Sequence, residues 1–190
     1  MVRSNRFPSP SGVLLDAGLA SLYTALSGDG LALTQDLELC RSVTGQDTLL
    51  VNPALVLHVS IGASTVATRN VIGNLFYRNV LLAQQVHQGI TLRTVTGVLA
   101  LADSRRKPGS APRGKALLGI QTRTAGGQIV VDYERCPLLP CKGEDAPGNT
   151  DEIGAAAPDL DLTHFTDAVP SNWQLGALGD HDEWAVGDVR

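Results

Sequence analysis

Aromatic residues and cysteines are scarce in this sequence, and long apolar runs are absent. Only 4% of the residues are aromatic and the cations are scattered, so we expect no nucleic-acid surface, which pairs basic patches with stacking rings. Three cysteines cannot all pair, and Cys136 and Cys141 lack the close spacing of a zinc or redox motif. The cysteines are therefore interpreted as reduced thiols of a cytoplasmic protein.

Membrane, metal and cofactor signals are missing as well. No run reaches the roughly 18 apolar residues of a membrane span, and residues 1–11 lack the apolar core of a secretory signal. His164 and His181 are too isolated to suggest a metal site. Phosphate-binding loops and a G-x-S-x-G nucleophile motif are also absent. We expect no membrane association, no metal and no cofactor.

The charges divide the chain into a basic body and an acidic tail. Residues 1–142 hold fourteen of the fifteen Lys and Arg residues but only eight of the nineteen Asp and Glu residues. A basic body suits a polyanionic ligand. Residues 143–171 are rich in Gly, Ala, Pro and Asp, which predicts a flexible acidic linker. Residues 172–190 regain an ordered composition and form a separate tail.

The apolar pattern of the body predicts an α+β domain. Apolar residues from Leu15 to Leu26 recur at helical spacing, and Gly28 ends that helix. Asn52 and Pro53 start a second helix, which runs to about Thr68 and is apolar on nearly all sides, as a buried helix is. Five strands are predicted at about 71–77, 80–86, 90–102, 116–124 and 128–139. The expected fold is an antiparallel sheet wrapped around one long buried helix.

Ten residues after the first helix carry a family resemblance. The segment SGDGLALTQD (27–36) is similar to the hydratase loop of the MaoC-like family, the (R)-specific enoyl-CoA hydratases and dehydratases, which reads Ser-Gly-Asp-x-Asn-Pro-x-His-x-Asp. Ser27, Gly28, Asp29 and Asp36 match this pattern, whereas Thr34 stands at the His position. The order of the predicted elements over about residues 13–140 agrees with the hot-dog fold of that family.

The resemblance implies hydration or dehydration of acyl-CoA thioesters. In the family, the loop Asp and His handle water and a proton, and an amide at the start of the buried helix polarises the thioester carbonyl. Asp29 is then the matched catalytic side chain, while Thr34 cannot act as a base near neutral pH. Pro53 stands where the amide donor is expected and has no N–H, although the amide of Ala54 is a possible substitute. As an alternative, Asp29 merely braces its turn.

Basic residues supply candidate contacts for the phosphates of coenzyme A. Arg105, Arg106 and Lys107, followed by Arg113 and Lys115, lie in a Gly- and Pro-rich loop between two strands. Arg78 follows the strand after the buried helix. Guanidinium groups match phosphate in geometry. The alternative is that these charges are only solvated.

Two functions therefore remain open at this point. One is an enoyl-CoA hydratase/dehydratase-like protein that acts on or binds acyl-CoA thioesters. The other is a non-catalytic hot-dog half that packs against and supports a catalytic unit. The resemblance implies a homodimer or pairing with another hot-dog unit, because such units pair through their sheet edges.

The ends of the chain bear on this pairing. Little chain precedes Val13 to supply the strand with which the family usually opens. The last residues, WAVGDV (184–189), resemble the opening strand of another hot-dog unit, so 172–190 is interpreted as the possible start of a second unit. The alternative is that residues 173–189 fold back and supply the missing strand of the first unit.

Overall fold

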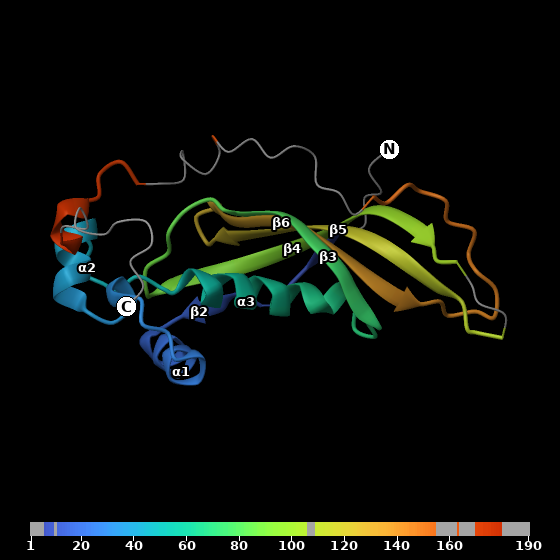
Figure 1. The fold of residues 1–190 in the computed structure, drawn as a ribbon, viewed down its shortest axis with the longest axis horizontal. Helices are drawn as coiled ribbons and strands as arrows, with labels where there is room; N and C mark the ends of the chain where they lie inside the picture. Colours follow the sequence, from blue (N-terminus) through green and yellow to red (C-terminus); the bar gives the residue numbers. More distant parts are fainter. Residues whose placement is uncertain (1–5, 10, 106–108, 155–162, 164–169, 180–190) are drawn as a thin grey trace, which may run out of the picture.

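The computed structural model describes residues 6–9, 11–105, 109–154, 163 and 170–179. Within these residues one antiparallel sheet is the centre of the molecule (Figure 1). Its strands follow the order β1-β4-β5-β6-β3, and β2 also pairs with β4. Their bounds are Arg6–Pro8 (β1), Val13–Leu15 (β2), Gly73–Leu82 (β3), Ile90–Asp103 (β4), Arg113–Thr124 (β5) and Ile129–Pro140 (β6). The predicted α+β class is confirmed.

Three α-helices accompany the sheet in the described part of the chain: α1 (Ala17–Ser27), α2 (Leu37–Thr44) and α3 (Pro53–Ser64). Short 3-10 turns lie at Ala32–Thr34, Thr65–Ala67 and Leu175–Leu178. Figure 1 shows α3 lying along one face of the sheet, with α1 beside its first half and α2 at one end of the molecule. The core between α3 and the sheet includes Leu55, Val56, Ile120, Val131 and Tyr133.

The long apolar helix is confirmed, but the structure buries one face of it rather than most of its surface. Leu55, Val56, Ser60 and Ser64 are buried against the sheet. His58, on the other side of the helix, is exposed. The apolar side chains that suggested burial on all sides therefore include several that are only half-buried in this chain.

The prediction of two strands at 71–77 and 80–86 is wrong, because residues 73–82 form the single strand β3 and residues 83–86 follow it without strand structure. The pairing of β3 with β6 shifts register between Arg78 and Leu81, and Asn79 there has a positive φ of 54°. Asn tolerates this conformation better than most residues, so a turn-like residue sits in a bulge inside a continuous strand. The strands predicted at 116–124 and 128–139 correspond to β5 and β6, and Gly126 and Gly127 lie in the turn between them, with Gly127 at φ 86°.

The expectation that too little chain precedes Val13 to supply much of the family's opening strand is wrong, because β1 and β2 both form before the first helix. β1 and β2 both pair with β4, and Leu15, expected in the helix, is the last residue of β2. Asp16 then caps α1 by accepting the amide proton of Leu19. The alternative source, 173–189, lies partly outside the described residues. Its described part forms the turn Leu175–Leu178 next to α2 instead.

The first residues of the predicted linker lie along β4. Thr150 forms a bridge with Ala102, and the amides of Asp103 and Asp151 donate to the carbonyls of Asn149 and Leu101. Backbone pairing of this kind holds residues 149–151 at the edge of the sheet, which a composition rich in Gly, Pro and Asp did not predict.

Candidate functional site

The loop 29–36 begins where α1 ends. Gly28 adopts the left-handed conformation (φ 68°), and its amide donates to the carbonyl of Thr24. Glycine pays no Cβ penalty there, so the chain leaves the helix abruptly and places Asp29 at the head of the loop. The sequence predicted this turn correctly.

Asp29 is half-buried and braces the loop from within. Its Oδ1 accepts the amide proton of Leu31 at 3.3 Å, and its own carbonyl accepts a proton from the Gln35 side chain at 2.7 Å. The hydroxyl of Thr34 lies 3.4 Å from Asp29 Oδ2 and donates mainly to the carbonyl of Leu31, at 2.8 Å. The structure thus brings together the two positions that carry the acid–base pair in the family pattern. The second one bears a hydroxyl instead of an imidazole.

Asp36, the last residue of the loop that matches the family pattern, is the N-cap of α2. Its side chain accepts the amide proton of Leu39 at 3.0 Å and thereby caps α2. An N-cap Asp satisfies one of the free amides of a helix start and interacts favourably with the helix dipole. The sequence predicted no helix at 37–44, although this cap was its starting signal.

The start of α3 offers fewer donors than a hydratase needs. Pro53 has no N–H, and the amide of Ala54 donates to Oδ1 of Asn52 at 2.7 Å. The possible substitute donor is therefore already used by the helix cap. This arrangement gives the helix a well-made N-terminus and removes the first two amides from ligand binding.

A small second core supports the back of the loop. Leu33 packs with Cys40, Val43 and Leu50, and the half-buried Trp173 joins this cluster. The amide of Leu50 donates to the carbonyl of Leu33 at 3.1 Å. The loop is therefore fixed between α2 and the segment that leads into α3.

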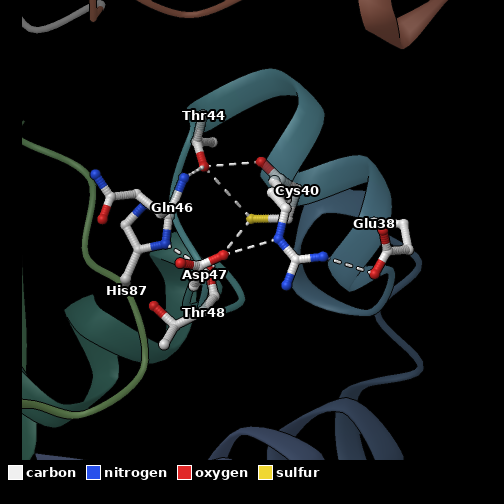
Figure 2. Close-up of polar contacts among 8 residues, drawn as sticks. Glu38, Cys40, Thr44, Gln46, Asp47, Thr48 and His87 are labelled. Carbon is white, nitrogen blue, oxygen red and sulfur yellow. Dashed lines mark hydrogen bonds and ion pairs between the residues drawn. The ribbon is translucent and has the colours of Figure 1, made fainter.

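Figure 2 shows the polar contacts that hold α2 and the segment after it. Arg41 bridges Glu38 and Asp47, each at 2.8 Å. The thiol of Cys40 donates to the carbonyl of Thr48 at 3.5 Å, and Nδ1 of His87 lies 2.9 Å from the same carbonyl. His87 thus contacts the connection to α3.

The described basic residues proposed for phosphate binding include Arg105 and Arg113 at the end of the β4–β5 hairpin and Arg78 on β3. Arg106 and Lys107 are outside the described residues. Arg105 lines a cavity at the end of the β4–β5 hairpin. Arg78 instead lies on β3, where its guanidinium forms an ion pair with Glu134 and donates to the carbonyl of Gly154. Figure 1 shows the β4–β5 hairpin end and the α1–α2 region at opposite ends of the molecule.

Sequence analysis missed a band of polar side chains between α3 and the sheet. Hydroxyls of Ser60, Thr94 and Thr122 are linked at 2.6 and 2.8 Å. Arg135, only 2% exposed, donates to Ser64 at 3.0 Å and to Asn74. The alternation of side chains along a strand could have revealed this band. Thr94, Thr122 and Arg135 occupy inward-facing positions, where the other inward-facing residues of the same strands are mostly apolar.

In the described part of the chain, no group of three or more His, Cys, Asp and Glu side chains could hold a metal ion. The helices described there are too short, or not apolar enough, to cross a membrane.

Comparisons with known proteins support the fold. The chain is similar to a conserved hypothetical protein from Mycobacterium tuberculosis with a double hot-dog fold (36% identity, TM-score 0.79, 94% of this chain and 54% of that chain). It is also similar to a putative MaoC domain protein dehydratase from Chloroflexus aurantiacus (22%, 0.74, 97% and 53%). An (R)-hydratase from A. caviae involved in PHA biosynthesis is a third similar structure (20%, 0.58, 72% and 95%).

These similarities confirm the hot-dog fold and, at the level of the fold, the resemblance to MaoC-like dehydratases and (R)-hydratases. The chain spans about half the length of the first two of these structures. No family model and no curated protein sequence matches it.

Proposed function

We propose that this hydratase-like hot-dog protein binds acyl-CoA thioesters, with Asp29 as its one candidate base. The observation that carries this proposal is the retained loop, in which Asp29 and Thr34 face each other as the family's paired residues do. A carboxylate alone is able to act as a general base when it reaches the proton to be moved. Thr34 can orient a water or a substrate oxygen, but it does not replace the proton transfer of an imidazole.

A second candidate function is a non-catalytic half that supports a catalytic hot-dog unit. The hydrogen bond between Ala54 and Asn52 favours it, because this bond occupies an amide that would otherwise polarise a thioester carbonyl. Losing one such donor typically slows acyl-transfer chemistry by about 10²–10³-fold. Under this hypothesis the chain still shapes a thioester site, while the acid–base residues come from the partner.

The domain arrangement remains a proposal of the same kind. Residues 1–142 form the hot-dog unit, 143–171 connect it, and 172–190 begin a further unit. Support comes from the similarity to one half of a double hot-dog protein. A homodimer is the alternative assembly, in which a second copy takes the place of the further unit.

The decisive experiment follows the loss of enoyl-thioester absorbance with a short panel of 2-enoyl-CoAs, together with calorimetric binding of the same compounds. The variant is Asp29→Asn, and its matched control is Asp145→Asn, which changes an exposed carboxylate outside the loop that forms no ion pair within the described residues. Turnover that is lost in Asp29→Asn and kept in the control supports the catalytic function.

Binding without turnover supports the non-catalytic half. Absence of both binding and turnover, in a protein that is folded by circular dichroism, refutes thioester binding by this chain.

A further inference from the structure

The last described segment of the chain, residues 170–179, returns to the region of the loop 29–36. It ends in the 3-10 turn Leu175–Leu178, which lies next to α2 (Figure 1). Residues 149–151, which come earlier in the predicted linker, are held near the end of β4, where Thr150 forms a bridge with Ala102. These two described parts of the chain are therefore fixed at opposite ends of the molecule (Figure 1).

The helix α2, on which the segment 170–179 lies, is too short to be stable alone. Its eight residues are fewer than the roughly 12–15 that an isolated helix needs in water. Cys40 and Val43, on its buried face, pack with Leu33 of the loop. The helix and the loop thus form one packed unit, whose stability depends on the residues that cover it.

The segment 170–179 covers this unit with a side chain and with its backbone. The half-buried side chain of Trp173 packs on the apolar cluster that contains Leu33. The amide of Gln174 donates to the carbonyl of Val43 at 2.8 Å. The last four carbonyls of a helix have no partner inside it, so this bond satisfies one of them from outside. The segment therefore stabilises the C-terminal half of α2.

The position of α2 in turn determines the shape of the loop. Asp36 is both the last residue of the loop and the N-cap of the helix. The carbonyl of Leu33 accepts the amide proton of Leu50 at 3.1 Å. Thr34, whose hydroxyl lies 3.4 Å from Oδ2 of Asp29, stands between these two fixed points. A shift of α2 therefore moves Thr34 relative to Asp29.

We propose that Trp173 is a positioning residue for the loop 29–36. Packed on α2, it keeps Thr34 and Asp29 in contact, and it acts on them through the cluster that contains Leu33. The loop then holds the shape in which it meets a ligand before the ligand arrives. The part of this inference that concerns a ligand rests on the proposed thioester function, whereas the part that concerns the loop does not.

Hydrogen exchange of the full chain, read by mass spectrometry of peptic fragments, tests the loop directly. Trp173→Ala removes the aromatic ring and Trp173→Phe keeps one. Leu175→Ala is the matched control, because Leu175 belongs to the same segment and is 52% exposed. We expect amides of residues 31–44 to exchange at least about tenfold faster in Trp173→Ala, because lost packing makes local opening easier. Amides of α3 and β5 should stay within about twofold of the parent in every variant, and so should residues 31–44 in the other two variants.

Binding of crotonyl-CoA, measured by calorimetry, tests the consequence for a ligand. If only about a tenth of the molecules keep the loop in its binding shape, the apparent affinity falls about tenfold. We expect this loss in Trp173→Ala. Trp173→Phe should restore the affinity to within about threefold of the parent, and Leu175→Ala should leave it unchanged.

Each result supports the inference or overturns it. Exchange in residues 31–44 that is unchanged in Trp173→Ala, or equally fast in Leu175→Ala, overturns it. Acceleration that spreads equally to α3 and β5 shows a general loss of stability and also overturns it. Faster loop exchange with unaltered crotonyl-CoA binding shows that Trp173 holds the loop and overturns its role for the ligand. If the parent binds no crotonyl-CoA, the proposed function fails, while the exchange result still decides whether Trp173 positions the loop.

Discussion

The hydroxyl of Thr34 lies 3.4 Å from Oδ2 of Asp29, so the loop keeps the contact between these two positions although a hydroxyl replaces the imidazole at the second. Its backbone conformation is fixed by Gly28, by the bracing bonds of Asp29 and by the cap at Asp36. None of these features requires an imidazole. A hydratase-like loop is therefore stable here without an imidazole at position 34.

Restoring the missing groups should create or raise hydratase activity. Thr34→His adds a base, and Pro53→Gly adds an amide donor at the start of α3. A general base contributes about 10²–10⁴-fold and an oxyanion donor about 10²–10³-fold. We expect the double variant to hydrate crotonyl-CoA at least about tenfold faster than the parent. The measurement is the loss of enoyl absorbance.

The matched control is the triple variant that also carries Asp29→Asn. If the loop geometry is responsible for the gain, the added substitution abolishes it. Equal activity of the double and triple variants would remove Asp29 from the mechanism. Glycine at position 53 also enlarges the freedom of the unfolded chain, at a cost of about 1 kcal/mol, which urea unfolding will reveal.

Asn52 should contribute to stability through the cap that it forms. Asn52→Ala leaves the amide of Ala54 without its 2.7 Å acceptor, and N-cap substitutions of this type cost about 1 kcal/mol. Urea unfolding measures the loss. Asn70→Ala is the control, because Asn70 is exposed and its side chain makes no hydrogen bond within the described residues. Similar losses of stability in both variants would show that the Asn52 cap makes no specific contribution to the free energy of unfolding.

The sequence predicted the fold from its strongest local signals. Asn52-Pro53 marks the start of a helix, Gly126-Gly127 marks a hairpin, and the alternation in β5 and β6 is clear. The prediction failed where pairing between distant strands decides the structure. β1 has only three residues and is held by its pairing with β4, and the break predicted between residues 77 and 80 falls inside a strand that pairs with β6.

The candidate site was predictable only in part. A sequence motif gives the order and spacing of residues along the chain, but it does not give their distances from residues elsewhere on the sheet. The loop motif located Asp29 and Thr34, which the structure brings together. The distance between this loop and Arg105 depends on the length of β4. Whether the Ala54 amide is free depends on a side-chain rotamer of Asn52. Sequence periodicity reports neither property.

Arg135 is a buried cation whose removal should destabilise the protein. Its Nε donates to Asn74 Oδ1 at 2.7 Å and its Nη1 to Ser64 at 3.0 Å. Arg135→Met leaves both partners unsatisfied, and the expected loss in unfolding free energy is about 2 kcal/mol. Arg93→Met, at an exposed position, should cost less than about 0.5 kcal/mol. An unchanged midpoint for Arg135→Met would mean that desolvation of the guanidinium cancels its hydrogen bonds.

Cys136 should make the stability of the protein fall in mildly alkaline solution. Burial raises the pKa of its thiol above the ordinary value of 9.0, and Lys115 and Arg78 oppose this shift only in part. In the unfolded chain the thiol ionises at the lower pKa, so rising pH stabilises the unfolded state first. The contribution to stability is therefore complete below the unfolded pKa and is lost as pH rises through the folded one.

The measurement for Cys136 is the free energy of urea unfolding at about pH 7.5 and about pH 9.5, below the range in which tyrosines ionise. The parent should lose more stability between these two values than Cys136→Ala does. Tyr133, whose pKa is also raised by burial, extends the same trend above about pH 10 and is why the upper limit matters. The comparison uses the change with pH within each protein, so any constant cost of the alanine cancels. Equal changes in the two proteins would show that the buried thiol does not control this pH dependence.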